Sequence, residues 1–305
     1  MSDSHDPQSR GDSAASDAQA AQGQGAAAGQ ADLDRFLERE AMQKRLSRIR
    51  HKILVMSGKG GVGKSTVAVN LAASLARAGK QVGLMDVDLH GPNVPKMLGI
   101  ETGRVTGEGD VIRPVQHSPN LKLMSIGFML PKQSDAVIWR GPLKMALIKQ
   151  FLRDVEWGDL DFLIIDAPPG TGDEPLTVGQ LIPDADGAIV VTTPQEVALT
   201  DIRKSITFCR KMGMRLLGII ENMSGFICPH CGERTDLFKT GGGARVAEEM
   251  DVPFLGGIPI DGSVVAAGDD GTPIVISDPE GAVGEAFAKV IANLELPAPA
   301  KPETQ

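Results

Sequence analysis

Short apolar runs alternate with longer segments of helical periodicity along most of the chain. Consecutive apolar residues predict strands at six places: Ile53–Met56, Val82–Met85, Phe162–Ile165, Ala188–Val191, Leu216–Ile220 and Phe254–Gly257. Apolar residues at helical spacing predict helices between and after them: Lys64–Ala78, Pro142–Val155, Glu174–Leu181, Val197–Met212, Gly243–Met250 and Ala282–Leu294. Strands that are apolar on both faces, each followed by a helix, are typical of a sheet covered on both sides. The pattern therefore predicts an α/β fold with three layers, a doubly wound, mostly parallel sheet with helices on both faces.

The ends of the chain and one internal region depart from this alternation. Residues 1–32 contain no Val, Ile, Leu or aromatic residue, and their five Asp against a single Arg make up half of the net charge of −8. Such a segment cannot bury enough apolar surface to fold, which predicts a disordered acidic tail. Residues 33–50 are expected to form an amphipathic helix packed on the body, and residues 297–305 a short loose end. A single domain is thus predicted over residues 51–296, in which 99–132 is less regular and forms a hairpin or edge strands at Val111–Val115 and Leu121–Ser125.

Composition excludes several classes of protein. The chain has 305 residues and is 42% hydrophobic, which is ordinary for a globular protein and excludes collagen-like, coiled-coil and wholly disordered chains. Its apolar runs are too short to cross a bilayer, and no signal peptide opens the sequence. Three cysteines are too few for a disulfide scaffold, so a cytoplasmic protein is expected. The acidic balance argues against nucleic acid or an anionic membrane as a main partner.

The strongest motif follows the first predicted strand. Residues Gly58–Thr66 fit the pattern G-x-x-x-x-G-K-[ST], with an apolar strand before them and an apolar-periodic helix after them. Glycines in such a loop let successive backbone N–H groups turn toward a phosphate, and the positive end of the helix adds to the attraction. The residues expected to contact the nucleotide are Gly58, Lys59, Gly60, Gly61, Val62, Gly63, Lys64, Ser65 and Thr66. Lys64 is expected to reach the β- and γ-phosphates of ATP, and the Ser65 hydroxyl to ligate Mg²⁺.

Lys59 makes this loop unusual. A second lysine at this position resembles the deviant P-loop of the MinD/ParA/nitrogenase-reductase group. In that group the extra lysine crosses a dimer interface to the nucleotide of the partner subunit. The resemblance therefore implies a homodimer in which Lys59 acts in trans, much as an arginine finger does.

Carboxylates follow two of the predicted strands. Asp86 and Asp88 come after the second strand, and Asp166 ends the strand that precedes a Pro- and Gly-rich loop. The carboxyl ends of parallel strands face the ligand crevice, where one of the first two could hold the water shell of the metal and the other the attacking water. An Asp pair after a strand is also common as a loop or helix cap. Asp166 is expected to bind Mg²⁺ through water, and Gly170 to donate its N–H to the γ-phosphate.

A cysteine pair lies late in the chain, in the turn Cys228-Pro-His-Cys231-Gly. Two thiolates at this spacing can chelate one metal centre, but a closed tetrahedral site or a cluster needs four ligands. Cys209 falls within a predicted helix and is expected to be structural. The missing ligands are therefore expected from the same pair in a second copy, and both a [4Fe–4S] cluster and a structural Zn²⁺ fit such a site. A redox pair ranks last, because thioredoxin-like motifs open a helix after a strand.

Taken together, these motifs resemble the Mrp/ApbC-type iron–sulfur cluster carriers. The resemblance covers residues 52–294 and rests on the P-loop, the two Asp-containing runs, the Glu221-Asn-Met segment and the cysteine pair. It implies an ATPase that holds a labile [4Fe–4S] cluster at its dimer interface and transfers the cluster to apo iron–sulfur proteins, in a cycle coupled to ATP binding and slow hydrolysis. By the same resemblance, Asn222 and Pro259 fall where the relatives read adenine. The chain departs from many relatives because only the tail and one helix precede the P-loop, and residues 1–50 contain no Cys for a second cluster.

Two other functions fit part of the sequence. A MinD/ParA-like positioning ATPase would act on a membrane or on DNA, but its membrane-binding members need a basic amphipathic C-terminal helix, and residues 295–303 are Pro-rich with no basic face. A zinc-bridged dimeric ATPase switch would use the cysteine pair as a clasp, and metal content distinguishes it from a cluster carrier.

Overall fold

The computed structural model describes residues 33, 36–88, 91–108, 111–129, 141–182, 184–228 and 230–297. The tail predicted over residues 1–32 and most of the loose end predicted at 297–305 lie outside these ranges. The chain divides into two compact units, residues 1–44 and residues 45–305, and the second contains the whole sheet. Among the described residues, every helix is too short or too polar to span a lipid bilayer.

The helix predicted over residues 33–50 is wrong at its C-terminal end. The described helical residues stop at 46, and the first strand, β1, begins at Ile49 and runs to Ser57. Ile49 and His51 are buried whereas Arg50 between them is exposed, which is the period of two that a strand produces. Ile49 is 2% exposed and pairs with Leu160 of the neighbouring strand. Pairing with a distant segment therefore decides the structure of residues whose local pattern continues a helix.

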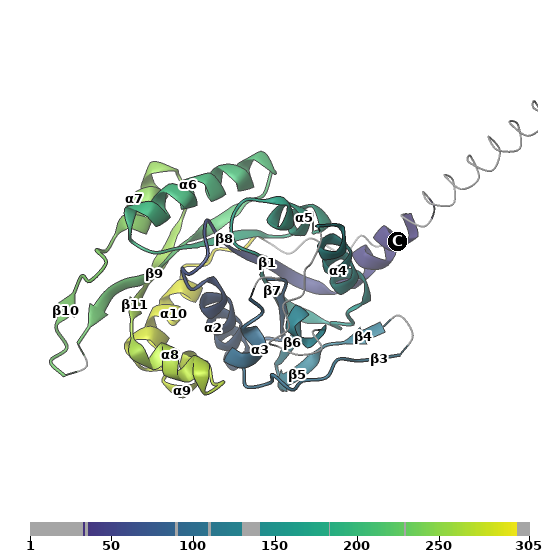
Figure 1. Ribbon diagram of the computed structural model, residues 1–305, viewed down its shortest axis with the longest axis horizontal. Coiled ribbons are helices and arrows are strands. Elements are labelled where there is room, and N and C mark those ends of the chain that lie inside the picture. The colour runs from purple at the N-terminus through teal and green to yellow at the C-terminus, as the bar shows by residue number, and fades with distance from the viewer. Residues whose placement is uncertain are drawn as a thin grey trace, which may run out of the picture. The chain divides into compact units, whose positions relative to one another are not determined.

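A single sheet forms the centre of the second unit (Figure 1). Its strand order is β10-β9-β8-β1-β7-β2-β6-β5, and β11 also pairs with β9. The pairs from β9 to β6 and the β11–β9 pair are parallel, whereas β5 and β10 are antiparallel to their neighbours. A separate two-stranded ribbon is formed by β3 and β4. The remaining bounds are β2 Val82–Asp86, β3 Thr106–Glu108, β4 Val111–Arg113, β5 Val115–Ser118, β6 Leu121–Ser125, β7 Leu160–Asp166, β8 Gly187–Thr192, β9 Leu216–Ile227, β10 Arg234–Thr235 and β11 Phe254–Ile260.

Helices cover both faces of the sheet, as the sequence predicts (Figure 1). One layer contains α2 Lys64–Arg77, α3 Val94–Met97, α8 Gly262–Asp269, α9 Ile274–Ser277 and α10 Ala282–Ala292. The other contains α4 Gly141–Asp154, α5 Asp173–Leu181, α6 Glu196–Lys211 and α7 Gly242–Glu249, and a 3-10 turn, η1, spans Ile126–Met129. The prediction of a doubly wound α/β fold is confirmed.

Each face of the sheet has its own core. Ile53 and Val55 of β1 are fully buried in the cluster that includes α2 and α10, whereas Val190 of β8 and Ile219 of β9 belong to the cluster under α6 and α7. Because strand side chains alternate between faces, both cores need apolar residues at consecutive positions, which explains the uninterrupted apolar runs. The irregular region contributes β6, which pairs with β2 inside the sheet, and β5, the antiparallel edge strand. Pro114 separates β4 from β5, because proline lacks the N–H that a ladder requires.

Candidate functional site

The P-loop connects β1 to α2 at the carboxyl edge of the sheet. Gly63 precedes the helix in the left-handed conformation, with φ of 83°. The side chain of Asn222 lies against it: Asn222 Nδ2 donates to the carbonyl oxygen of Val62 at 3.0 Å. A Cβ atom on Gly63 would stand 2.1 Å from Nδ2, so only glycine fits here. The loop is thus shaped by its own sequence and by a residue of β9.

Most of the predicted phosphate-binding residues line one cavity of about 330 Å³, into which Asp88 and Pro169 also face. Those residues are Lys59, Gly60, Gly61, Gly63, Lys64, Ser65 and Thr66. Val62 is buried at 2% exposure, and Gly58 lies outside the cavity lining, packed against the backbone of Asp201. The glycine-rich backbone that lines the cavity is of the kind that binds phosphate groups.

Lys64 contacts two of the predicted carboxylates. Its Nζ lies 2.5 Å from Asp166 Oδ1 and 3.4 Å from Asp88 Oδ2, with 6% of the lysine side chain exposed. Burial acts to lower the pKa of Lys64, but the charges of Asp166 and Asp88 outweigh it and the pKa is raised. The lysine is therefore a permanent cation at the base of the phosphate cavity.

Asp86 and Asp166 lie side by side, because they are register partners on the parallel strands β2 and β7. Both are fully buried. Asp86 accepts a hydrogen bond from Ser125 Oγ at 2.7 Å and another from the backbone N–H of Asp88 at 3.1 Å. Burial, and then the charge of Asp166, raise the pKa of Asp86 to about 8, and burial also raises the pKa of Asp166. Two adjacent buried carboxylates are stable together only when they share a proton or face a cation.

The donor set fits Mg²⁺. Asp166 Oδ2 is buried and has no hydrogen-bond partner among the described residues, so one hard oxygen remains for an ion or for its water. No group of three or more His, Cys, Asp or Glu in the described ranges is arranged as a metal cage. Mg²⁺ bound with a nucleotide does not need such a cage, since one or two protein oxygens plus phosphates and waters complete its octahedron.

The loop after β7 is tied to the P-loop. The N–H of Gly170 donates to the carbonyl oxygen of Ser57 at 2.8 Å. The predicted donation from Gly170 to a γ-phosphate therefore requires this bond to break, which makes the loop a candidate sensor of the phosphate.

The two residues expected at adenine lie on neighbouring strands. Asn222 is on β9, and Pro259 follows Ile258, the register partner of Asn222 on β11. The amide nitrogen of Asn222 is used by Val62, which leaves its amide oxygen as the atom able to accept from the amino group of adenine.

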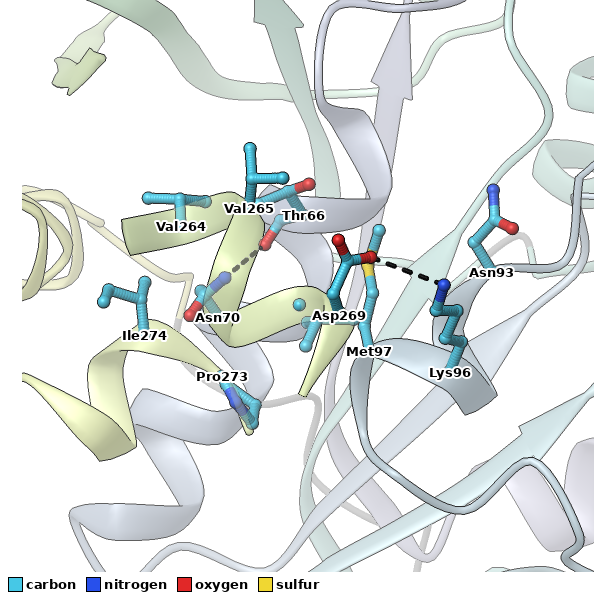
Figure 2. Close-up of a pocket in the computed structure, with 12 residues that line it drawn as sticks. Thr66, Asn70, Asn93, Lys96, Met97, Val264, Val265, Asp269, Pro273 and Ile274 are labelled. Atoms are coloured by element: carbon cyan, nitrogen blue, oxygen red, sulfur yellow. Dashed lines mark hydrogen bonds and ion pairs between the residues drawn. The ribbon is translucent and has the colours of Figure 1, made fainter. Parts of the chain in front are cut away.

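A second cavity of about 290 Å³ adjoins the first and shares Thr66, Asn93 and Met97 with it. Figure 2 shows it between α2, α3 and α8, with the Lys96–Asp269 ion pair of 3.4 Å on one side. The sequence pattern does not predict this cavity, because α8 is not among the predicted helices. A signal for α8 exists in Asp261, whose side chain caps the helix by accepting from the N–H of Ser263 at 2.8 Å.

The cysteine pair lies where β9 turns into β10. Cys228 is half-buried and Cys231 is exposed. The backbone N–H groups of Cys231 and then His230 donate to the Cys228 sulfur and hold the pKa of that thiol below its usual range. The turn is closed by the N–H of Cys228 donating to Glu233 O at 2.9 Å and the N–H of Gly232 donating to Cys228 O at 2.8 Å. A tight turn with a stabilised thiolate is well suited to a soft metal.

Cys209 is separate from this pair and structural. It is fully buried on α6, with its Sγ 3.8 Å from Met56 Sδ. Burial raises the pKa of its thiol to about 11. The neutral thiol thus acts as a small core residue.

A P-loop between a buried strand and a helix, with a buried aspartate at the end of a neighbouring parallel strand, defines a P-loop NTPase, and the second lysine of the loop, Lys59, is typical of the MinD/ParA class. The ParA family, described as NUBPL iron-transfer P-loop NTPase, matches residues 48–295. The chain belongs to this family.

Similar proteins agree with this assignment. The chain is 51% identical over 253 residues to a protein of Methanocaldococcus jannaschii named iron-sulfur cluster carrier protein, covering 83% of this chain and 87% of that protein. A protein of the same name from Methanococcus maripaludis is 48% identical over 262 residues, covering 85% and 90%. Among solved structures, a nucleotide-binding protein of Archaeoglobus fulgidus in complex with ADP and containing cobalt is 41% identical, with a TM-score of 0.71 over 82% of this chain and 96% of that one. The cell division ATPase MinD of Pyrococcus furiosus is 28% identical, with a TM-score of 0.60 over 80% and 98%. The resemblance predicted from the motifs is confirmed.

Proposed function

We propose that this chain is an ATP-dependent carrier that binds a [4Fe–4S] cluster between two copies of itself and delivers it to apo iron–sulfur proteins. The observation that carries the proposal is the accessible cysteine pair at the end of β9, the strand whose Asn222 contacts the P-loop. Two relatives about half identical to this chain are named iron-sulfur cluster carrier proteins, which supports the same cargo here.

The nucleotide chemistry follows from the charges around the phosphate cavity. Water attacks the γ-phosphorus of ATP, the bond to the bridging oxygen breaks, and ADP and phosphate leave. Lys64 compensates the phosphate charge, Asp88 orients the water, and Lys59 of a second copy reaches the same nucleotide. Ser65 and Asp166 would hold Mg²⁺, with Asp86 beside them, and the ion would add positive charge where the β- and γ-oxygens become more negative.

Cluster transfer requires ligand exchange only. Cys228 and Cys231 of each copy supply four thiolates, and thiolates of the client replace them one by one while the iron and sulfide stay together. No electron moves in this step. An exposed site shared by two chains suits a cargo that must leave, and closure of the dimer on ATP would change the spacing of the four thiolates.

Metal content after anaerobic purification and reconstitution tests the proposal. About four iron and four sulfide per dimer are expected for the wild type, and neither in the Cys228→Ala/Cys231→Ala variant. The matched control is Cys209→Ala, which removes the buried thiol and should retain the cluster. One zinc per dimer without iron would refute the carrier function and favour the zinc-bridged switch.

A positive result leads to a transfer assay. The reconstituted protein is mixed with an apo-ferredoxin, and the rise of the ferredoxin spectrum is followed with and without Mg²⁺ and ATP. Lys64→Ala should bind the cluster but lose any effect of ATP on the transfer rate, because its phosphate site lacks the cation.

A further inference from the structure

Both cysteines are carried by a segment that leaves the sheet and returns to it. We name residues 225–241 the cysteine arm. It begins at Gly225 and ends at Gly241, and both glycines are left-handed, with φ of 76° and 77°. From residue 230 to 239 every residue of the arm is exposed, and its described residues pair with the sheet near its start, through β10 with β9 and through Phe226 with Ile260 of β11 (Figure 1). So few contacts with the body make the position of the arm depend on how its two ends are held.

One buried carboxylate holds both ends. Glu221 is fully buried on β9, where its Oε1 accepts from Ser224 Oγ at 2.6 Å and from the N–H of Gly241 at 2.9 Å. Ser224 immediately precedes the arm and Gly241 closes it. The other oxygen, Oε2, accepts from the N–H of Gly243 at 2.5 Å in the first turn of α7. These hydrogen bonds compensate the free-energy cost of burying the carboxylate. Removing one of them would therefore leave a buried polar group without its partner and destabilise this region.

The same strand touches the P-loop at the next residue. Asn222 donates to Val62 O at 3.0 Å, and its amide occupies the space beside Gly63. Met223, between this contact and the arm, is itself left-handed with φ of 57°. Three consecutive residues thus contain the anchor of the arm, the contact with the phosphate loop and a sharp change in strand direction.

We infer that Glu221 is a positioning residue that sets the place of the cysteine arm relative to the P-loop, so that nucleotide in the loop changes the exposure of Cys228 and Cys231. The inference rests on the proposed nucleotide site and deepens the proposed function. A shift of the P-loop moves the Asn222 amide, the adjacent Glu221 moves with the strand, and the two ends of the arm follow the carboxylate. Glu221 acts on the cysteines through the backbone of the arm and does not touch the cargo.

Replacing the carboxylate by an amide separates this role from general stability. In Glu221→Gln one oxygen becomes an NH₂ group, which cannot accept from the N–H of Gly241 or Gly243. The side chain keeps its size, whereas one end of the arm or of α7 loses its partner. Ser224→Ala is the milder variant, because it removes one hydrogen bond and leaves the charge in place. The matched control is Glu248→Gln on the exposed side of α7, which makes the same chemical change away from the arm.

The test measures the alkylation rate of each cysteine in the apo protein by mass spectrometry, with no nucleotide, with Mg²⁺ and ADP, and with Mg²⁺ and a non-hydrolysable ATP analogue. Buried Cys209 is the internal reference. In the wild type and in Glu248→Gln, nucleotide should change the rates at Cys228 and Cys231 several-fold. In Glu221→Gln the ratio of rates with and without nucleotide should fall to about one although nucleotide still binds, and Ser224→Ala should give an intermediate ratio.

Two results would overturn the inference. One is that nucleotide leaves the alkylation rates of Cys228 and Cys231 unchanged in the wild type, and the other is that Glu221→Gln responds to nucleotide like the wild type. The assay contains no cluster, so a negative result would refute this inference without testing which cargo the protein binds. A nucleotide response in a protein that binds only zinc would refute the carrier function and leave the coupling role of Glu221 supported.

Discussion

The buried carboxylate of Asp86 makes the stability of the protein depend on pH in an unusual direction. Burial, and then the charge of Asp166, raise the pKa of Asp86 from 3.8 to about 8 in the folded protein. Between these values the folded chain keeps the proton and the unfolded chain releases it. The contribution of Asp86 to stability is therefore greatest in acid, decreases as pH rises toward 8, and stays at its lowest value above that.

The expected size of this effect is large for a single residue. Each unit of pKa difference corresponds to about 1.4 kcal/mol, so about 4 kcal/mol of the free energy of unfolding is lost between pH 5 and pH 8. Asp86→Asn removes the titration, while its amide oxygen can still accept from Ser125. The free energies of unfolding of the variant and the wild type should thus converge only in acid, below the unfolded pKa, and the excess of the variant over the wild type should grow by about 4 kcal/mol between pH 5 and pH 8.

Urea unfolding followed by far-UV circular dichroism from pH 5 to pH 9 measures this difference, because groups that titrate equally in both proteins cancel. Asp159→Asn is the control. The Asp159 side chain is exposed and hydrogen-bonded to Arg48, which lowers its pKa, so Asp159 does not titrate between pH 5 and pH 9 and its variant should differ from the wild type by an amount that stays constant over this range. Parallel pH profiles for the wild type and Asp86→Asn would show that Asp86 is ionised in the folded protein and refute the reasoning.

Further predictions concern thiols and the core. At pH 8 a thiol reagent should modify Cys228 and Cys231 quickly and Cys209 only after urea unfolding, since burial raises the pKa of Cys209 to about 11; three fast thiols in the native protein would contradict its burial. Phe151→Ala on α4 removes a fully buried ring and should lower the free energy of unfolding by about 3–5 kcal/mol. Leu143→Ala on the same helix, where the side chain is 57% exposed, should cost about 0.5 kcal/mol or less, and an equal loss in both variants would argue against the packing of α4.

Elements formed by apolar runs were predictable from the sequence, and elements that continue into polar residues were not. The run Leu216–Ile220 predicts the start of β9, but the strand continues to Ile227. The additional residues include Glu221, whose acidic side chain ends the apolar run and so predicts the end of the strand. Glu221 stays in the strand because Gly241 and Gly243, about twenty residues later, donate to its carboxylate. The partners of these hydrogen bonds are too far apart in the sequence for a local pattern to predict them.

The candidate site shows the same division. The motif identifies Lys64, Asp88 and Asp166 as one group, because a P-loop and the carboxyl ends of parallel strands meet at one sheet edge. The motif does not predict the hydrogen bond from the N–H of Gly170 to the carbonyl oxygen of Ser57, because that bond depends on the distance between two loops. Residue types at motif positions are set by the ligand, whereas the contacts that hold the loops are set by the packing of this fold.

The length of β9 limits how the two sites of one chain can communicate. Cys228 lies six positions after Asn222, which contacts the P-loop, and at about 3.3 Å per residue a straight strand would place the two about 20 Å apart. The left-handed residues Met223 and Gly225 bend the chain and shorten this distance. Nucleotide and cysteines of one chain are therefore joined by a short bent strand, so that a small rotation at its start moves the turn that contains the cysteines. Coupling of this kind needs a firm anchor at the bend, and Glu221 with its three hydrogen bonds is the described group that provides one.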